Sequence, residues 1–162
     1  MSDDLRCRLG ERREGQELER MRGAAAEVLT ARGPGSGEVQ PDVPVGVLDA
    51  VRGFWSMSAE PVATLGSEAS ASASASGEHL ASWVEELLAR HGFHAHTHAT
   101  AFLLTGLGLM PWIEFRMPRP GWFASIRRAK DPAWVFLRSD FGAVAAVSEQ
   151  EYRYEFFVAH LA

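Results

Sequence analysis

Three histidines alternate with other residues in one short stretch of the sequence, His-Ala-His-Thr-His. Residues two apart on a β-strand point to the same face, so His94, His96 and His98 would form a row of imidazoles. A neutral imidazole is a common ligand of zinc and other divalent transition metals. The outer two histidines are roughly 13 Å apart along a strand, which is too far for them to share one ion. A complete site therefore needs a further ligand, for which Glu114 and His160 are candidates.

The histidine row has two other interpretations. Its alternation continues into Thr100, Phe102 and Leu104, which predicts a half-buried strand whose polar end leaves the core. Clustered imidazoles also titrate near neutral pH, so the row could act as a proton switch. Because no clear fourth ligand and no cysteine stands nearby, we expect weak metal binding at most. No cofactor is expected, and zinc or another divalent transition metal is the alternative.

The segment that follows the histidines is rich in basic and aromatic residues. Arg116, Arg119 and Trp122 flank a turn at residues 118–121, and Arg and Trp are frequent hot-spot residues of protein interfaces. Such a segment can also bind single-stranded nucleic acid, but the chain carries a formal net charge of −5, which argues against that partner. We predict a protein partner at these three residues, although a purely structural turn would look similar in sequence.

Little in the sequence supports nucleophilic catalysis. Cys7 is the only cysteine and lies in a charged segment with nothing to activate it, and no serine stands in a Gly-x-Ser-x-Gly motif. Glu85 and Glu86 are adjacent on a predicted helix and point in different directions. The favoured function is therefore a non-enzymatic interaction or regulatory module, which binds a protein partner through its sheet and its aromatic and arginine surface. The alternative is a metal-binding enzyme or sensor that uses the histidine row.

Composition indicates a small globular protein. Hydrophobic residues make up 46% of the 162 positions and charged residues 23%, so there is material for one core. No apolar run reaches the roughly 18 residues that a membrane helix needs. With a single cysteine there is no intrachain disulfide, and we expect a cytoplasmic protein without a membrane partner.

Hydrophobic periodicity divides the chain into four segments. Residues 1–15 are dense in charge and are predicted to be a tail, and residues 16–65 form a helical N-terminal segment. An Ala/Ser-rich stretch at 66–78 is predicted to be a flexible linker, with a long loop inside one domain as the alternative. Residues 79–162 are predicted to form an α+β domain.

The second predicted helix of the N-terminal segment has a strongly apolar stripe. Val47, Val51, Phe54 and Trp55 recur on one side of it and are too apolar to leave in water. We therefore expect this helix to pack on the C-terminal domain or on a second copy of the chain, as in a homodimer. If the Trp55 ring is fully buried, its replacement by alanine should cost roughly 3–5 kcal/mol.

The C-terminal segment alternates in the manner of a sheet. A helix over 78–90 precedes strand-like runs, and the short connections between them favour antiparallel pairing. The predicted strands cover residues 93–105, 112–117, 122–128, 133–138 and 152–160, while 141–147 fits either helix or strand. The predicted class is α+β, with N-terminal helices and then one helix packed on a mostly antiparallel sheet of four to five strands.

Overall fold

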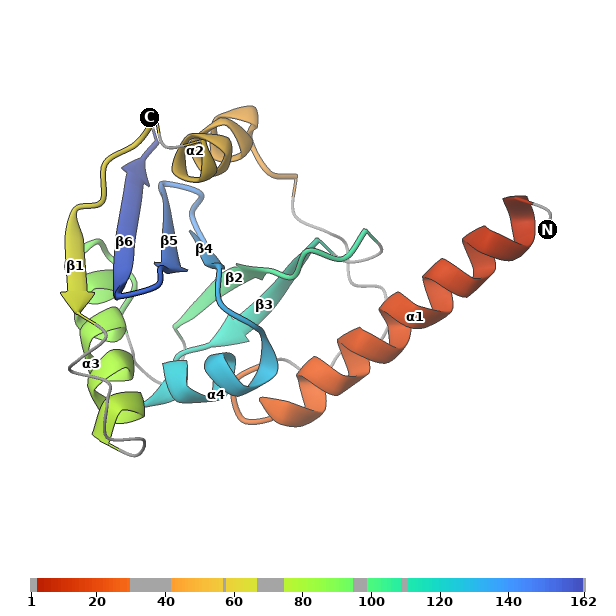
Figure 1. Cartoon of the computed structure of the whole chain (residues 1–162), viewed down its shortest axis with the longest axis horizontal. Coiled ribbons are helices and arrows are strands. Elements are labelled where there is room, and N and C mark those ends of the chain that lie inside the picture. The colour runs from red at the N-terminus through yellow and green to blue at the C-terminus, as the bar shows by residue number, and fades with distance from the viewer. Residues whose placement is uncertain are drawn as a thin grey trace.

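The structure is a computed structural model, and it describes residues 3–29, 42–56, 58–66, 75–94, 99–108 and 111–161. Within these residues the chain forms four helices and one six-stranded sheet in which all neighbouring strands are antiparallel (Figure 1). The predicted α+β class is therefore confirmed, with one strand more than the upper end of the expected range.

The order of strands in the sheet is β1-β6-β5-β4-β2-β3. Strands β4, β5 and β6 follow one another as a meander, and β2 and β3 form a hairpin. Strands β3 and β4 lie on either side of β2, and helix α4 connects them. The bounds of the strands are β1 Ala63–Gly66, β2 Thr100–Leu104, β3 Trp112–Arg116, β4 Trp134–Arg138, β5 Ala143–Glu149 and β6 Arg153–His160.

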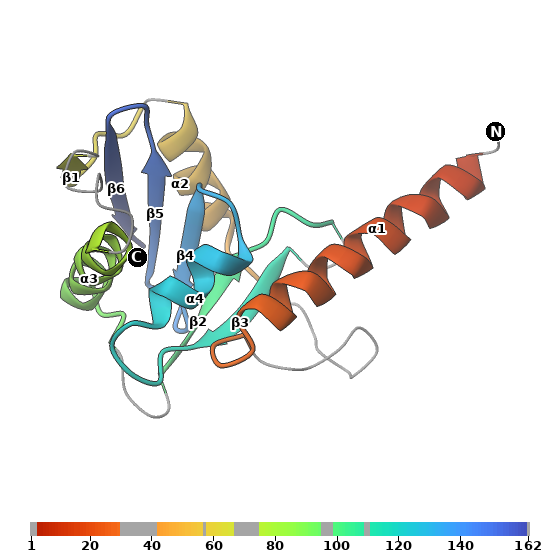
Figure 2. The same ribbon diagram turned by 60° about the horizontal axis from the view of Figure 1, so that its bottom comes forward.

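The two faces of the sheet are covered unequally, because side chains alternate between them along each strand. One face carries the larger core, and helices α3 (Ala75–Arg90) and α4 (Trp122–Ala129) pack on it together with the end of α1 (Asp3–Ala24). The opposite face carries a smaller core under helix α2 (Val45–Trp55) alone. Figure 2 shows α3 and α2 on opposite sides of β5 and β6. In the described part of the chain, α2 is the one helix on this second face, and it leaves part of the face uncovered.

The N-terminal segment belongs to the same folded unit as the sheet. Leu18 and Met21 of α1 are buried in the larger core, and the backbone N–H of Arg116 donates to the carbonyl of Val28 at 2.7 Å. Strand β1 pairs with β6 along its whole length. The packing expected from the apolar stripe of α2 is thus made with the chain's own sheet. Of the predicted linker, residues 67–74 lie outside the described residues, and its remaining residues end β1 and begin α3.

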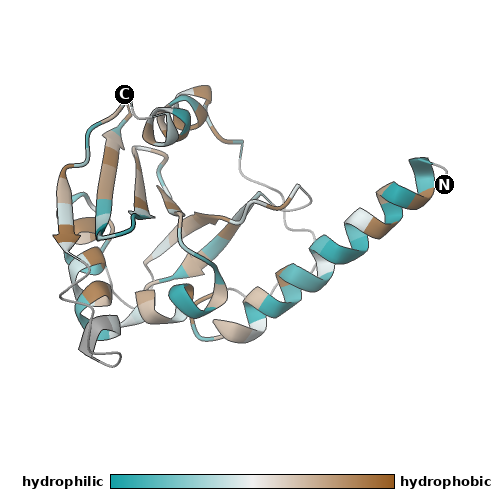
Figure 3. Cartoon of the chain, in the orientation of Figure 1, coloured by the Kyte–Doolittle hydropathy of each residue, from teal (hydrophilic) through white to brown (hydrophobic). Residues whose placement is uncertain are grey.

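The predicted charged tail is helical over residues 3–15, because α1 runs without interruption from Asp3 to Ala24. Ion pairs one helical turn apart support such a helix, and Arg8 pairs with Asp4 at 3.2 Å. Only the C-terminal end of α1 is buried, and the rest extends away from the body of the molecule (Figure 1) with a mostly hydrophilic surface (Figure 3).

The predicted strand at 122–128 is wrong, because these residues form helix α4. Its buried residues Trp122, Phe123, Ile126 and Ala129 recur at helical spacing. The start of the helix is fixed from another part of the chain. The Glu85 carboxylate of α3 accepts hydrogen bonds from the backbone N–H groups of Gly121 and Phe123, at 2.9 and 2.8 Å.

Replacing Glu85 with alanine should therefore destabilise the fold by roughly 0.5–2 kcal/mol, the usual cost of losing a helix N-cap. Its neighbour Glu86 is the matched control, because that side chain is exposed and binds Arg90 of the same helix, not α4. Urea unfolding of the two alanine variants measures the difference. Equal losses for Glu85→Ala and Glu86→Ala would show that the cap does not hold α4.

Candidate functional site

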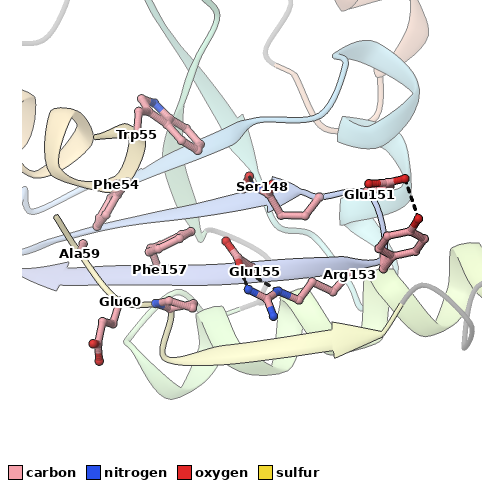
Figure 4. A pocket seen from close by; sticks show the side chains of 12 residues that line it. Phe54, Trp55, Ala59, Glu60, Ser148, Glu151, Arg153, Glu155 and Phe157 are labelled. Carbon is pink, nitrogen blue, oxygen red and sulfur yellow. Dashed lines mark hydrogen bonds and ion pairs between the residues drawn. The ribbon is translucent and has the colours of Figure 1, made fainter. Parts of the chain in front are cut away.

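A groove of about 520 Å³ opens on the α2 side of the sheet, next to the turn that joins β5 to β6. Its floor is formed by Ser148 of β5 together with Glu155 and Phe157 of β6, which point to the same face (Figure 4). The end of α2 forms one wall, and residues 59–61, which lead to β1, form the other. We call this feature the sheet groove. It is the part of the second face that α2 leaves uncovered.

The end of α2 is held in place by a compact turn. The carbonyl of Gly53 accepts hydrogen bonds from the backbone N–H of Ala59 and the hydroxyl of Ser58, both at 3.2 Å. Inside this turn, the Phe54 ring packs on Phe157 with 5.6 Å between the ring centroids. Phe54 is 5% exposed. The inner end of the sheet groove is therefore apolar and well anchored.

Two large aromatic side chains remain exposed at the rim of the sheet groove. Trp55 at the end of α2 is 41% exposed, and Tyr152 in the β5–β6 turn is 73% exposed. Aromatic side chains lose little conformational entropy on binding and contribute large contact areas, which makes them common anchors in interfaces. Exposed aromatic side chains on both sides of a concave surface make the sheet groove a candidate binding surface.

The sheet groove has more negative than positive charge. Glu60, Glu151 and Glu155 line it, with Arg153 as its one basic residue. Arg153 forms an ion pair with Glu155 at 2.6 Å, which leaves the other two carboxylates in excess. The Tyr152 hydroxyl donates to Glu151 at 2.7 Å, and this bond raises the pKa of Tyr152. A cationic ligand is the electrostatic complement of this surface.

The Ser148 hydroxyl is the one serine hydroxyl among the described residues that line the sheet groove, and these residues include no histidine and no cysteine. This hydroxyl accepts a hydrogen bond from the Gln150 side chain at 2.7 Å. A serine nucleophile needs a neighbouring base to take its proton. Glu155 lies opposite Ser148 in the β5–β6 pair, and its carboxylate forms the ion pair with Arg153. The same residues can, however, hold a positive charge between aromatic rings and carboxylates.

The predicted partner-binding residues do not come together as an exposed cluster. Trp122 is 3% exposed and packs against Phe115 with 5.1 Å between the ring centroids, so its ring is buried and not exposed at the turn. The reason is that α4 turns this side chain toward the larger core. Arg116 and Arg119 are exposed, and Arg119 forms an ion pair with Glu27 at 3.5 Å. Neither arginine lines the sheet groove.

Of the histidine row, only His94 is described, and it is exposed; His96 and His98 lie outside the described residues. In the described part of the chain, no group of three or more His, Cys, Asp or Glu residues is arranged to hold a metal ion. His160, a candidate further ligand, instead meets His91, with 3.0 Å between His91 Nδ1 and His160 Nε2. In the sequence, His91 belongs to the dense group of histidines before residue 99, but no local pattern links it to His160.

The pKa of His91 is lowered, first by burial and then by the nearby charges of His160 and Arg90. A lowered pKa means that His91 binds a proton more tightly in the unfolded chain than in the folded one. The contribution of neutral His91 to stability is therefore fully present above the unfolded pKa of about 6.5, and it is lost as the pH falls below that value. We therefore expect the urea midpoint to decrease between about pH 7 and 5.5 in chelator-treated protein. His91→Gln should reduce this decrease, and His79→Gln, at an exposed position of helix α3, should not. Parallel pH profiles for all three proteins would contradict the assignment.

No helix in the described ranges is both long enough and apolar enough to cross a membrane. Comparisons with protein-family models, with curated proteins and with solved structures found no match. The proposal for function therefore depends on the geometry and charge of the chain itself.

Proposed function

We propose that the protein is a non-enzymatic interaction module that binds a cationic segment of a protein partner in the sheet groove. The observation that carries the proposal is the combination of exposed Trp55 and Tyr152 with an excess of carboxylates in one concave surface. An arginine or lysine side chain placed there gains a cation–π contact with a ring and an ion pair with Glu60 or Glu151.

The size of the sheet groove supports a short segment as the ligand. Its volume of about 520 Å³ is in the usual range for ligand sites, which is about 300–1,000 Å³. A few side chains of an extended peptide fill such a space, with the cation near the rim and an apolar side chain against Phe54 and Phe157. Arg116 and Arg119 remain an alternative contact surface for a protein partner, as predicted from the sequence.

Selection from a phage-displayed library of random 12-residue peptides on the whole chain tests this function. We expect the selected peptides to be enriched in arginine or lysine next to an apolar residue. They should bind poorly to the double variant Trp55→Ala with Tyr152→Ala. Both original side chains are exposed, so this double replacement leaves the core intact. Peptides that are enriched in acidic residues, or that bind this variant equally well, would contradict the proposal.

A further inference from the structure

Two imidazoles from distant parts of the sequence meet beside the C-terminal end of α3. His91 follows the last residue of α3, and His160 is the last residue of β6. Although they are 69 residues apart in the chain, His91 Nδ1 lies 3.0 Å from His160 Nε2, and the ring centroids are 5.2 Å apart. The two ring nitrogens therefore face each other at hydrogen-bond distance.

His91 is held firmly in this place. Its ring stacks on the buried Phe156 at a centroid distance of 6.0 Å and an angle of 22°. Its backbone N–H donates to the carbonyl of Leu88 at 3.0 Å, and its own carbonyl accepts from Arg138 Nη1 at 3.0 Å. These contacts anchor the His91 half of the pair.

We propose that His91 and His160 form a binding site for one copper(II) or nickel(II) ion. Two metal–nitrogen bonds of about 2.1 Å whose nitrogen atoms are 3.0 Å apart enclose an angle of about 90°. That angle fits the square-planar or tetragonal geometry of copper(II) and nickel(II). Tetrahedral zinc would need the two nitrogen atoms about 3.4 Å apart, so one ring would have to move.

Binding of the ion replaces the hydrogen bond between the two rings. In the free pair, one of the two facing nitrogens donates its proton to the other. On binding, the donor ring moves this proton to its outer nitrogen through solvent, so that both facing nitrogens offer a lone pair. No net proton is released, and the metal keeps its oxidation state.

The surroundings of the pair limit the affinity. Two cationic side chains lie near His91: Arg90 precedes it in the chain, and Arg138 binds its carbonyl. Each of them also pairs with a carboxylate, Arg90 with Glu86 and Arg138 with Asp140. In the described ranges no third metal-binding side chain joins the two histidines. Water or an external ligand therefore fills the remaining positions on the ion, and we expect a modest affinity with copper(II) ahead of nickel(II) and zinc.

Calorimetric titration of the tag-free chain with copper(II), together with electron paramagnetic resonance, tests the site. We expect one bound ion per chain with a nitrogen coupling pattern from two imidazoles. His91→Ala and His160→Ala should each weaken binding at least about tenfold, the lower limit even for losing an outer partner of a metal ligand. His79→Ala and His94→Ala are the matched controls, because both side chains are exposed and outside the pair.

The exposed position of His160 keeps the test informative if His91→Ala fails to fold. Binding that is unchanged in His160→Ala would overturn the proposal. Loss of binding in His94→Ala alone would assign the ion to the histidine row instead and would also overturn it. A zinc affinity above those of copper(II) and nickel(II) would contradict the geometric argument.

Discussion

Replacing Phe54 with alanine should lower the free energy of unfolding by about 3–5 kcal/mol, the range for removing a buried phenylalanine. Phe54 is 5% exposed, and its ring fills the space between α2 and Phe157 of the sheet. Because α2 is the only helix on this face in the described part of the chain, little else can close the cavity. Guanidinium unfolding followed by circular dichroism measures the loss.

The neighbouring residue supplies the control for this prediction. Trp55→Ala removes a larger ring, yet the indole is 41% exposed, so we expect less than half the loss caused by Phe54→Ala. The sequence pattern alone placed both rings on one apolar stripe and, for a fully buried indole, predicted a loss of roughly 3–5 kcal/mol for Trp55→Ala. Equal or greater destabilisation by Trp55→Ala would show that α2 is rotated relative to the structure described above.

The second large effect concerns binding. A selected cationic peptide should bind Trp55→Ala and Tyr152→Ala each at least about tenfold more weakly than the parent chain, as for a hot-spot residue that contributes about 1.4 kcal/mol or more. Glu151→Gln should weaken binding less and reduce its dependence on salt, because it removes one exposed charge. Fluorescence anisotropy of a labelled peptide measures all of these variants.

Arg119→Glu is the matched control for the binding series. Arg119 is exposed but lies outside the sheet groove, so this change should leave the affinity of a cationic peptide within about twofold, aside from general charge effects. A larger loss in Arg119→Glu than in Trp55→Ala would place the binding surface at the turn predicted from the sequence.

Hydrophobic periodicity in the sequence predicted several of the helices and strands correctly. Helix α3 and strands β3, β4 and β6 follow their own periodicity. Short connections from β2 to β3, from β4 to β5 and from β5 to β6 join strands that pair antiparallel. Helix α4 was missed because its aromatic and branched residues resemble a strand, while its cap comes from Glu85, which lies 36 residues before Gly121. Strand β1 was missed because its four residues form a strand only beside β6.

The candidate sites depended even more on distant contacts. The sheet groove combines the end of α2 with the β5–β6 turn, and no sequence pattern links residues 54–61 to residues 148–157. The same holds for His91 and His160, which become neighbours only because β6 ends beside α3. Trp122 shows the converse case, because its residue type suggested an exposed hot spot and helix α4 buried it.

The most direct test of the binding proposal is to map a selected cationic peptide on the whole chain by amide chemical shifts in nuclear magnetic resonance. We predict that the largest shifts fall at residues 54–61 and 148–157, on both sides of the sheet groove. They should be absent when the peptide's arginine or lysine is replaced by glutamine. Shifts centred on Arg116 and Arg119, with none around Trp55 and Tyr152, would contradict the proposal.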